Sequence, residues 1–166
     1  MRMSADRIEK EVLLKAPLDR VWRAISDSEE FGRWFGVRFD GPFVAGESVN
    51  GVMTPTEVDE EVAAMQEPYA GEADAWHIVA VEPPHRLAFR WHPYAVEPGS
   101  REPEAPTTLV EFTLAEADGG VLLRIVESGF DAIPAERRKS AFESNSEGWA
   151  HQAEMVRKYL ALGESV

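Results

Sequence analysis

Glu127 is the residue whose type and position point most directly to chemistry. It follows Leu123 and Ile125 at steps of two in a predicted strand, so its carboxyl group should face the side of those apolar side chains, toward the C-terminal helix. A carboxylate in an apolar setting needs a partner or a raised pKa, and such a group can act as a general base. Alternatively, the strand ends at Glu127 and the side chain meets solvent. The candidate partners are Asn145, Arg90 and His77.

His92 is the second candidate general base, because His92-Pro93-Tyr94 stands where a predicted strand meets a loop and is placed to line a pocket mouth. The four histidines lack metal-ligand spacing such as HExxH, and no serine has the context of a nucleophile elbow. The sequence has no cysteine, which excludes disulfides, thiolate metal sites and cysteine nucleophiles. GxGxxG and P-loop motifs are also missing. We therefore predict no metal and no cofactor, with Glu127 and His92 as the only catalytic candidates.

Aromatic side chains supply the other feature of a site, because pockets for small molecules are mostly apolar with a few directed polar groups. Packing in the hydrophobic core is the alternative explanation for each of these aromatic residues. Trp34, Trp91 and Trp149 are favoured, since they lie at element ends or beside Gly148, a glycine in mid-helix. The predicted ligand-binding residues are Trp34, Phe35, Phe39, Met53, Trp76, Trp91, Tyr94, Phe112, Glu127, Phe130, Asn145 and Trp149.

A long C-terminal helix, residues 134–162, must position much of this set. Its apolar residues recur at helical spacing and share one face, and Pro134 suits the first turn. No other predicted helix has a similar length, so this face should pack on a sheet. The residues of the face are Phe142, Trp149, Ala153, Val156 and Leu160.

The preceding chain predicts that sheet. After a first strand come two short helices, the second capped by Asp27 or Ser28, and then about six strands joined mostly by turns. Such connections indicate an antiparallel sheet and an α+β class. Residues 55–74 are predicted to be an inserted loop or lid with a short helix near 58–65, and residues 93–106 a second long loop. The predicted strands are 8–15, 37–40, 48–54, 75–81, 86–92, 107–115 and 121–129, and the predicted short helices are 17–26 and 28–36.

Composition narrows the function classes. A chain of 166 residues suggests a single domain, 1–166 with a core of 8–162. The net charge of −13 disfavours nucleic acid and anionic membrane surfaces. No apolar run approaches the roughly 20 residues of a membrane span, and the N-terminus lacks an apolar signal core, so we expect a cytoplasmic protein.

Four motifs, in order, resemble the SRPBCC (START-like, Bet v allergen-like) superfamily in its branch of heat-shock protein 90 ATPase activator homologues. The resemblance covers about residues 8–162 and implies the helix-grip fold, a curved antiparallel sheet of six to seven strands around the C-terminal helix, with a cavity between them. Val121 stands where the family usually has threonine. Ala153 and Val156 replace larger residues, which adds Ala153 to the predicted ligand-binding residues. The motifs are VLLKAPLDRVWRAISDSEEFGRWF, VEPPHRLAFRW, LVEFTLAEADGGVLLRIVESGF and GWAHQAEMVRKYL.

Three functions are compatible with these observations. The first is a binding protein that holds a small hydrophobic or aromatic molecule in the cavity. The second is a cyclase or hydratase acting on an aromatic or polyketide substrate through Glu127 or His92. The third, which the family resemblance implies, is a chaperone-regulator domain, although the chain lacks the separate N-terminal domain of the eukaryotic activators. A homodimer through an exposed sheet edge stays open.

Overall fold

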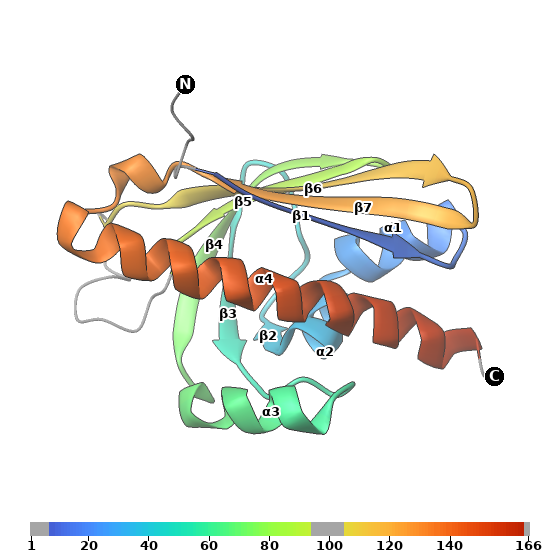
Figure 1. Cartoon of the computed structure of the whole chain (residues 1–166), viewed down its shortest axis with the longest axis horizontal. Helices are drawn as coiled ribbons and strands as arrows, with labels where there is room; N and C mark the ends of the chain where they lie inside the picture. Colours follow the sequence, from blue (N-terminus) through green and yellow to red (C-terminus); the bar gives the residue numbers. More distant parts are fainter. Residues whose placement is uncertain (1–6, 94–104, 165–166) are drawn as a thin grey trace.

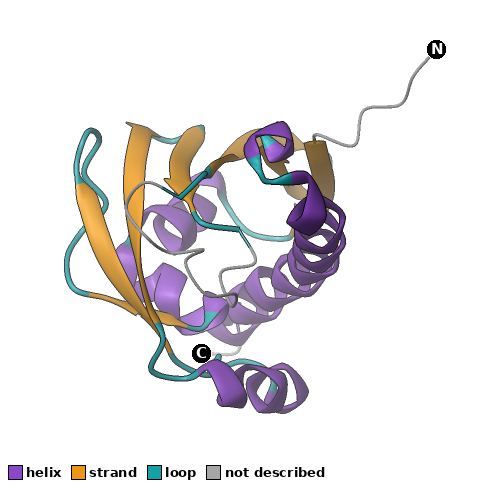
Figure 2. Ribbon diagram, turned by 90° about the vertical axis from the view of Figure 1, so that its left-hand side faces the viewer, coloured by secondary structure: helices purple, strands orange, loops and turns teal. Residues whose placement is uncertain are grey.

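The computed structural model describes residues 7–93 and 105–164. Seven strands form one antiparallel sheet in the order β1-β7-β6-β5-β4-β3-β2 (Figure 1), so β1 pairs with the last strand of the chain. The strands bend around the helices (Figure 2), which confirms the predicted α+β helix-grip fold with a curved sheet. The strands are β1 (Arg7–Leu14), β2 (Val37–Phe39), β3 (Ser48–Met53), β4 (Ala73–Glu82), β5 (Arg86–Trp91), β6 (Thr108–Ala117) and β7 (Gly120–Ser128).

Helices α1 (Leu18–Ser26) and α2 (Ser28–Phe35) fill the space between β1 and β2. Asp27 is the N-cap of α2, and its carboxylate accepts the backbone N–H groups of Glu29 and Glu30 at 2.9 and 3.0 Å. Gly36 ends the helix in the left-handed conformation, at φ 98°. Both short helices therefore lie where the sequence predicts them, and their corner turns the chain into β2.

Residues 60–69, which we call the lid segment, comprise α3 (Glu60–Gln66) and the 3-10 turn η1 (Glu67–Tyr69). Asp59 caps α3 by accepting the backbone N–H of Val62 at 2.9 Å. The lid segment lies below α4 and beside the ends of β3 and β4 (Figure 1). The predicted short helix in this region thus forms, two residues later than expected at its start.

Helix α4 (Ala135–Glu164) crosses the concave side of the sheet and contacts β1, α1 and α2. A second 3-10 turn, η2 (Phe130–Ala132), connects β7 to it. Of the predicted apolar face, Trp149, Ala153, Val156 and Leu160 are buried and Phe142 is half-buried. Where the chain is described, none of the helices has the length and apolar character that a membrane crossing requires.

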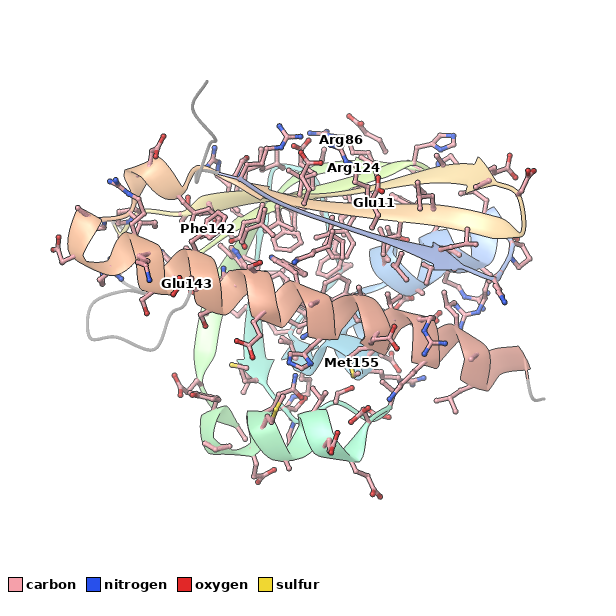
Figure 3. The ribbon with its side chains drawn as sticks, in the orientation of Figure 1. Glu11, Arg86, Arg124, Phe142, Glu143 and Met155 are labelled. Atoms are coloured by element: carbon pink, nitrogen blue, oxygen red, sulfur yellow. The ribbon has the colours of Figure 1, made fainter. Side chains whose placement is uncertain are left out.

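The outer face of the sheet is charged and joins neighbouring strands by ion pairs. Arg86 on β5 contacts Glu111 on β6 at 2.8 Å, and Arg124 on β7 contacts Glu9 on β1 at 2.5 Å. Figure 3 shows Arg86 and Arg124 on the side of the sheet away from α4. The alternation of strand side chains therefore sends these charges outward and leaves the inward set for the core and the site.

Candidate functional site

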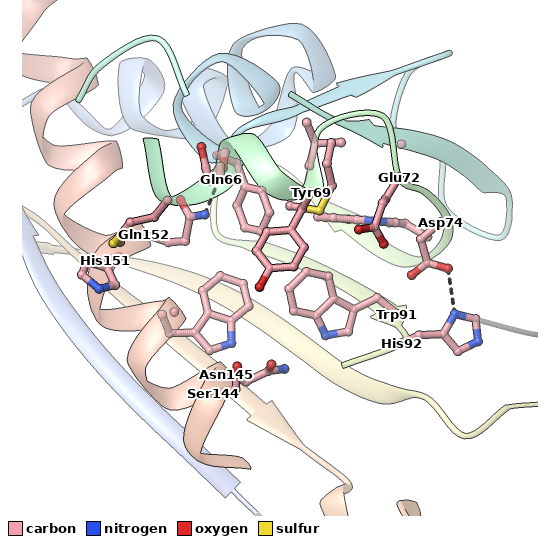
Figure 4. Close-up of a pocket in the computed structure, with 18 of the residues that line it drawn as sticks. Gln66, Tyr69, Glu72, Asp74, Trp91, His92, Ser144, Asn145, His151 and Gln152 are labelled. Carbon is pink, nitrogen blue, oxygen red and sulfur yellow. Dashed lines mark hydrogen bonds and ion pairs between the residues drawn. The ribbon is translucent and has the colours of Figure 1, made fainter. Parts of the chain in front are cut away.

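A pocket of about 340 Å³ lies between the lid segment, strands β2 to β5 and the middle of α4. Figure 4 shows Asp74 and His92 at one end of it, His151 and Gln152 at the other, and Trp91 with Tyr69 between them. Exposed Met65 and Tyr69 on the lid segment mark where it meets solvent. The described lining residues are Phe35, Val37, Gly51, Met53, Val62, Met65, Gln66, Tyr69, Glu72, Ala73, Asp74, Trp76, Trp91, His92, Ser144, Asn145, Gly148, Trp149, His151 and Gln152.

Three indoles and a phenyl ring form the apolar wall. Trp91 lies 5.0 Å from Trp76 in an edge-to-face arrangement and 5.4 Å from Trp149, with planes 31° apart. Phe35 packs against Trp149 at 5.9 Å. Rings at these separations and angles attract one another beyond simple burial and hold each other in place. The wall is therefore a preformed aromatic surface assembled from α2, β4, β5 and α4.

Glu127 on β7 lies behind this wall with none of its surface exposed. Its Oε2 accepts hydrogen bonds from the Trp91 indole at 2.7 Å and from the Thr108 hydroxyl at 2.5 Å. Its Oε1 accepts from the Trp149 indole at 2.8 Å and from the Asn145 amide at 2.9 Å. All four donors are uncharged. An indole N–H can only donate a hydrogen bond, so both carboxyl oxygens act as acceptors here.

The carboxylate of Glu127 thus sets the position of the pocket wall. Glu127 is not among the lining residues, whereas Trp91, Asn145 and Trp149, which donate to it, all are. Both indoles are hydrogen-bonded to the same buried carboxyl group, so they are held with restricted tilt. The predicted orientation of Glu127 toward the helix is confirmed, and Asn145 is one of its partners. The other two candidate partners contact different residues. His77 lies 3.3 Å from the Ser48 hydroxyl, and Arg90 donates to Thr107 at 3.4 Å.

His92 pairs with a carboxylate at the opposite end of the pocket from Gln152. Its Nδ1 lies 2.8 Å from Asp74 Oδ1, and only 7% of its side chain is exposed. The second ring nitrogen, Nε2, is buried and finds no hydrogen-bond partner among residues 7–93 and 105–164. An imidazole oriented by a carboxylate with its other nitrogen unoccupied is the arrangement of a general base.

Gln152 on α4 carries the second unpartnered polar atom of the pocket. Its Nε2 donates to the Phe35 carbonyl at 3.0 Å, which fixes the amide orientation because a carbonyl oxygen accepts and cannot donate. The buried Oε1 has no partner in the part of the chain that the structure describes. Gln66 on the lid segment donates to the same Phe35 carbonyl at 3.0 Å, so the lid segment, α2 and α4 meet at one backbone group.

The structure brings about half of the predicted ligand-binding residues into one pocket. His92, predicted as a general base, lines it too. Trp34 instead donates its indole N–H to the Ala24 carbonyl at 2.9 Å within the core, and Ala153 is buried away from the lining. Phe39, Phe112 and Phe130 also pack in or against the core. Tyr94 lies outside the described residues. The predicted residues that line the pocket are Phe35, Met53, Trp76, Trp91, Asn145 and Trp149.

Sequence reasoning missed the lid segment residues and one stripe of α4. Ser144, Gly148, His151 and Gln152 follow one another at helical spacing, parallel to the aromatic stripe, and all four line the pocket. That spacing could have predicted a second lining face on the helix. The lid segment also contributes lining residues, and apart from the Asp59 cap no sequence signal predicts them, because nothing local shows where the segment packs. These residues are Val62, Met65, Gln66 and Tyr69.

Comparison with solved structures agrees with this architecture. DynU16, a protein of the dynemicin biosynthetic locus, superposes with a TM-score of 0.67 at 23% identity; the match covers 95% of this chain but 48% of DynU16, so the chain spans about half of that protein. A Mesorhizobium loti protein matches with a TM-score of 0.68 at 20% identity, over 93% of this chain and 96% of its own. A Nitrosomonas europaea protein matches with a TM-score of 0.69 at 16% identity, over 99% and 100%.

Sequence comparison identifies the family. No curated protein matches the chain. The sequence model described as "Activator of Hsp90 ATPase homolog 1-like protein" matches residues 15–161, from the end of the first strand to the last turns of α4. The match covers most of the chain and confirms the resemblance seen in the four motifs. The chain therefore belongs to the Activator of Hsp90 ATPase homolog 1-like family, within the SRPBCC superfamily.

Proposed function

We propose that the protein binds a small, largely apolar or aromatic molecule in the pocket beneath the lid segment. The observation that carries this proposal is the aromatic wall of Trp76, Trp91 and Trp149 around a volume of about 340 Å³, at the lower end of the roughly 300–1,000 Å³ of ligand pockets. Buried polar atoms normally find partners, so the orphaned Gln152 Oε1 and His92 Nε2 support a ligand that offers polar contacts at its ends.

Gly148 provides the variant that tests binding without disturbing the fold. It lies in mid-helix on the lining of the pocket, and a Cβ placed on it meets no atom within 4 Å. A leucine there should extend into the pocket while improving helix propensity. Ala150→Leu is the matched control, because it adds the same kind of side chain to an exposed position of the same helix outside the pocket.

The experiment screens aromatic, polyketide-like and lipid compounds by thermal shift and native mass spectrometry. We expect wild type and Ala150→Leu to be stabilised by the same compounds and Gly148→Leu to respond to none of them. Compounds that stabilise all three proteins equally would place binding outside this pocket. No response from wild type to any compound would count against the proposal as a whole.

Enzymatic acid–base chemistry is a second candidate, and His92 is the observation that favours it. The imidazole is oriented by Asp74 and keeps a buried nitrogen unoccupied in a pocket residue. Glu127 is less suited to act on a ligand, since its oxygens already accept five hydrogen bonds behind the wall. Incubation of a bound compound, followed by mass spectrometry for hydration or loss of water, distinguishes catalysis from binding. His92→Gln should abolish turnover and retain binding if this candidate is right.

A further inference from the structure

The pocket has acidic side chains in addition to its apolar wall. Among the described lining residues are the carboxylates Glu72 and Asp74, and none is lysine or arginine. Figure 4 shows both carboxylates above Trp91, on the side of the pocket where Tyr69 lies. Glu127 adds a third carboxylate directly behind Trp91 and Trp149. A cation inside the pocket would therefore face negative groups on two sides.

The indole wall strengthens this preference. A cation over an aromatic face is attracted by the negative potential of the ring, and tryptophan gives the strongest attraction of the aromatic side chains. Trp91 and Trp149 each donate their N–H to the Glu127 carboxylate, at 2.7 and 2.8 Å. Such a bond polarises the donor group and shifts electron density into the ring, so the faces become more negative. Because the four donors to Glu127 are uncharged, no positive side chain among them cancels the effect.

Gln152, at the opposite end of the pocket from Asp74, separately favours a ligand that donates a hydrogen bond at that end. Its Oε1 is a buried acceptor without a partner, which a ligand satisfies only by donating a hydrogen bond. An ionised carboxylate at that end of the ligand has no hydrogen to donate to Gln152. The chain as a whole, at a net charge of −13, also attracts cations and repels anions as they approach.

We infer that the pocket selects an organic cation, a protonated amine carried on an aromatic or apolar body. This inference rests on the proposed function, because it names the chemical class of ligand for the same pocket. The aromatic body packs against Trp76, Trp91 and Trp149, and the ammonium group lies among the indole faces and carboxylates.

Three probes that share a naphthalene ring test the inference by isothermal titration calorimetry near neutral pH. They are 2-(2-naphthyl)ethylamine, which is protonated, 2-(2-naphthyl)ethanol, which is neutral and also donates a hydrogen bond, and 2-naphthylacetate, which is anionic. We expect the amine to bind about tenfold more tightly than the alcohol, the difference that a partly desolvated cation–π contact supplies, and the acetate to bind most weakly. Raised salt should weaken the amine and leave the alcohol unchanged.

Two variants locate the selectivity. Asp74→Asn keeps a hydrogen-bonding group toward His92 and removes a charge, so the ratio of amine affinity to alcohol affinity should fall severalfold. Trp91→Phe keeps an apolar ring but removes the indole that donates to Glu127, and it should reduce the preference in the same way. Because amine and alcohol share the naphthalene ring, the ratio of their affinities in each variant removes any loss of packing that both probes suffer.

The outcomes separate the two proposals. If the alcohol or the acetate binds as tightly as the amine, the cation inference is overturned and the proposed binding function stands. If Asp74→Asn and Trp91→Phe both bind the alcohol normally and keep the full preference for the amine, selection arises elsewhere and the inference fails. If none of the probes binds wild type, both proposals fail.

Discussion

Glu127 on β7 accepts the indole hydrogen of Trp149 on α4 at 2.8 Å, which joins the sheet to the helix inside the core. The acceptor is a fully buried carboxylate whose donors are all neutral, so each donor supplies a large share of its stabilisation. Removing one donor leaves a buried acceptor with fewer partners and no access to water, which costs more than the loss of an exposed hydrogen bond.

Trp149→Phe tests this relationship, because it keeps an aromatic ring and removes the N–H. Trp34→Phe is the matched control, since Trp34 is equally buried but donates to the neutral carbonyl of Ala24. We expect both variants to lower the free energy of unfolding, with the loss about 1 kcal/mol larger at Trp149 because its acceptor is a fully buried side-chain carboxyl group. Urea unfolding measures the difference. An equal or larger loss at Trp34 would mean that Glu127 does not depend on this donor.

Two glycine-to-alanine variants should change stability in opposite directions. At Gly148 the new methyl group meets no atom within 4 Å, so higher helix propensity should raise the free energy of unfolding by about 0.5–1 kcal/mol. At Gly32 a Cβ would lie 2.0 Å from the Val37 carbonyl oxygen, and forcing α2 away from β2 should cost about 1–3 kcal/mol. Thermal unfolding of both proteins is the measurement. Shifts of the same sign would contradict the close approach at Gly32.

Glu30 should make the protein less stable in acid. Burial alone raises the pKa of this carboxyl group, but hydrogen bonds from Tyr159 and Arg20, with the charges of Arg20 and Arg23, outweigh it and lower the pKa below its ordinary value of 4.5. On acidification the unfolded state takes up the proton first. The contribution of Glu30 to stability is therefore complete above the unfolded pKa and disappears as the pH falls through the folded pKa.

Glu30→Gln checks this pH dependence. We expect the variant to be about 2 kcal/mol less stable near neutral pH, because charge-assisted bonds joining α1, α2 and α4 become neutral. The gap between variant and wild type should narrow as urea unfolding is repeated from about pH 6 down to about pH 3. Parallel losses of stability in the two proteins would assign the acid sensitivity to other groups.

Lys158 on α4 holds the lid segment by an ion pair with Asp59, the residue that caps α3. The hydrogen bond from Lys158 is the main cause of the lowered pKa of Asp59. Lys158→Met should speed amide hydrogen exchange in residues 60–69 severalfold and leave β6 and β7 unchanged, since few other contacts hold this segment. Lys139→Met, which removes an ion pair with Glu143 within α4, is the control and should not affect the lid segment.

The elements were predictable because their signals are local. Asp27 and Gly36 mark the two ends of α2 by cap chemistry, and the period of two in β7 correctly turned Glu127 inward. The wall residues Trp91 and Trp149 were predicted for a similar reason, since each lies on the apolar side of its element.

The membership of the pocket was harder to predict, because it depends on contacts between distant segments. Trp34 was favoured because it lies at the end of an element, yet α2 turns it into the core and its N–H donates to the Ala24 carbonyl. Ala153 shares a helix face with Trp149 but lies on the next turn, outside the pocket. The role of Glu127 as an anchor for two indoles required knowing that β5, β7 and α4 meet at one point, which no spacing in the sequence records.

The pairing of β1 with β7 has a consequence for synthesis in the cell. Ile8 on β1 lies opposite Glu127 on β7. Strand β1 can therefore pair in the sheet only after β7, the last of the seven strands, has left the ribosome. Contacts between residues so far apart in the chain slow folding, and unpaired strands are prone to aggregate while they wait. The nascent chain must therefore keep β1 unpaired through most of translation. Its partner strand β7 also carries Glu127, so the sheet edge and the anchor of the two indoles form at the same stage.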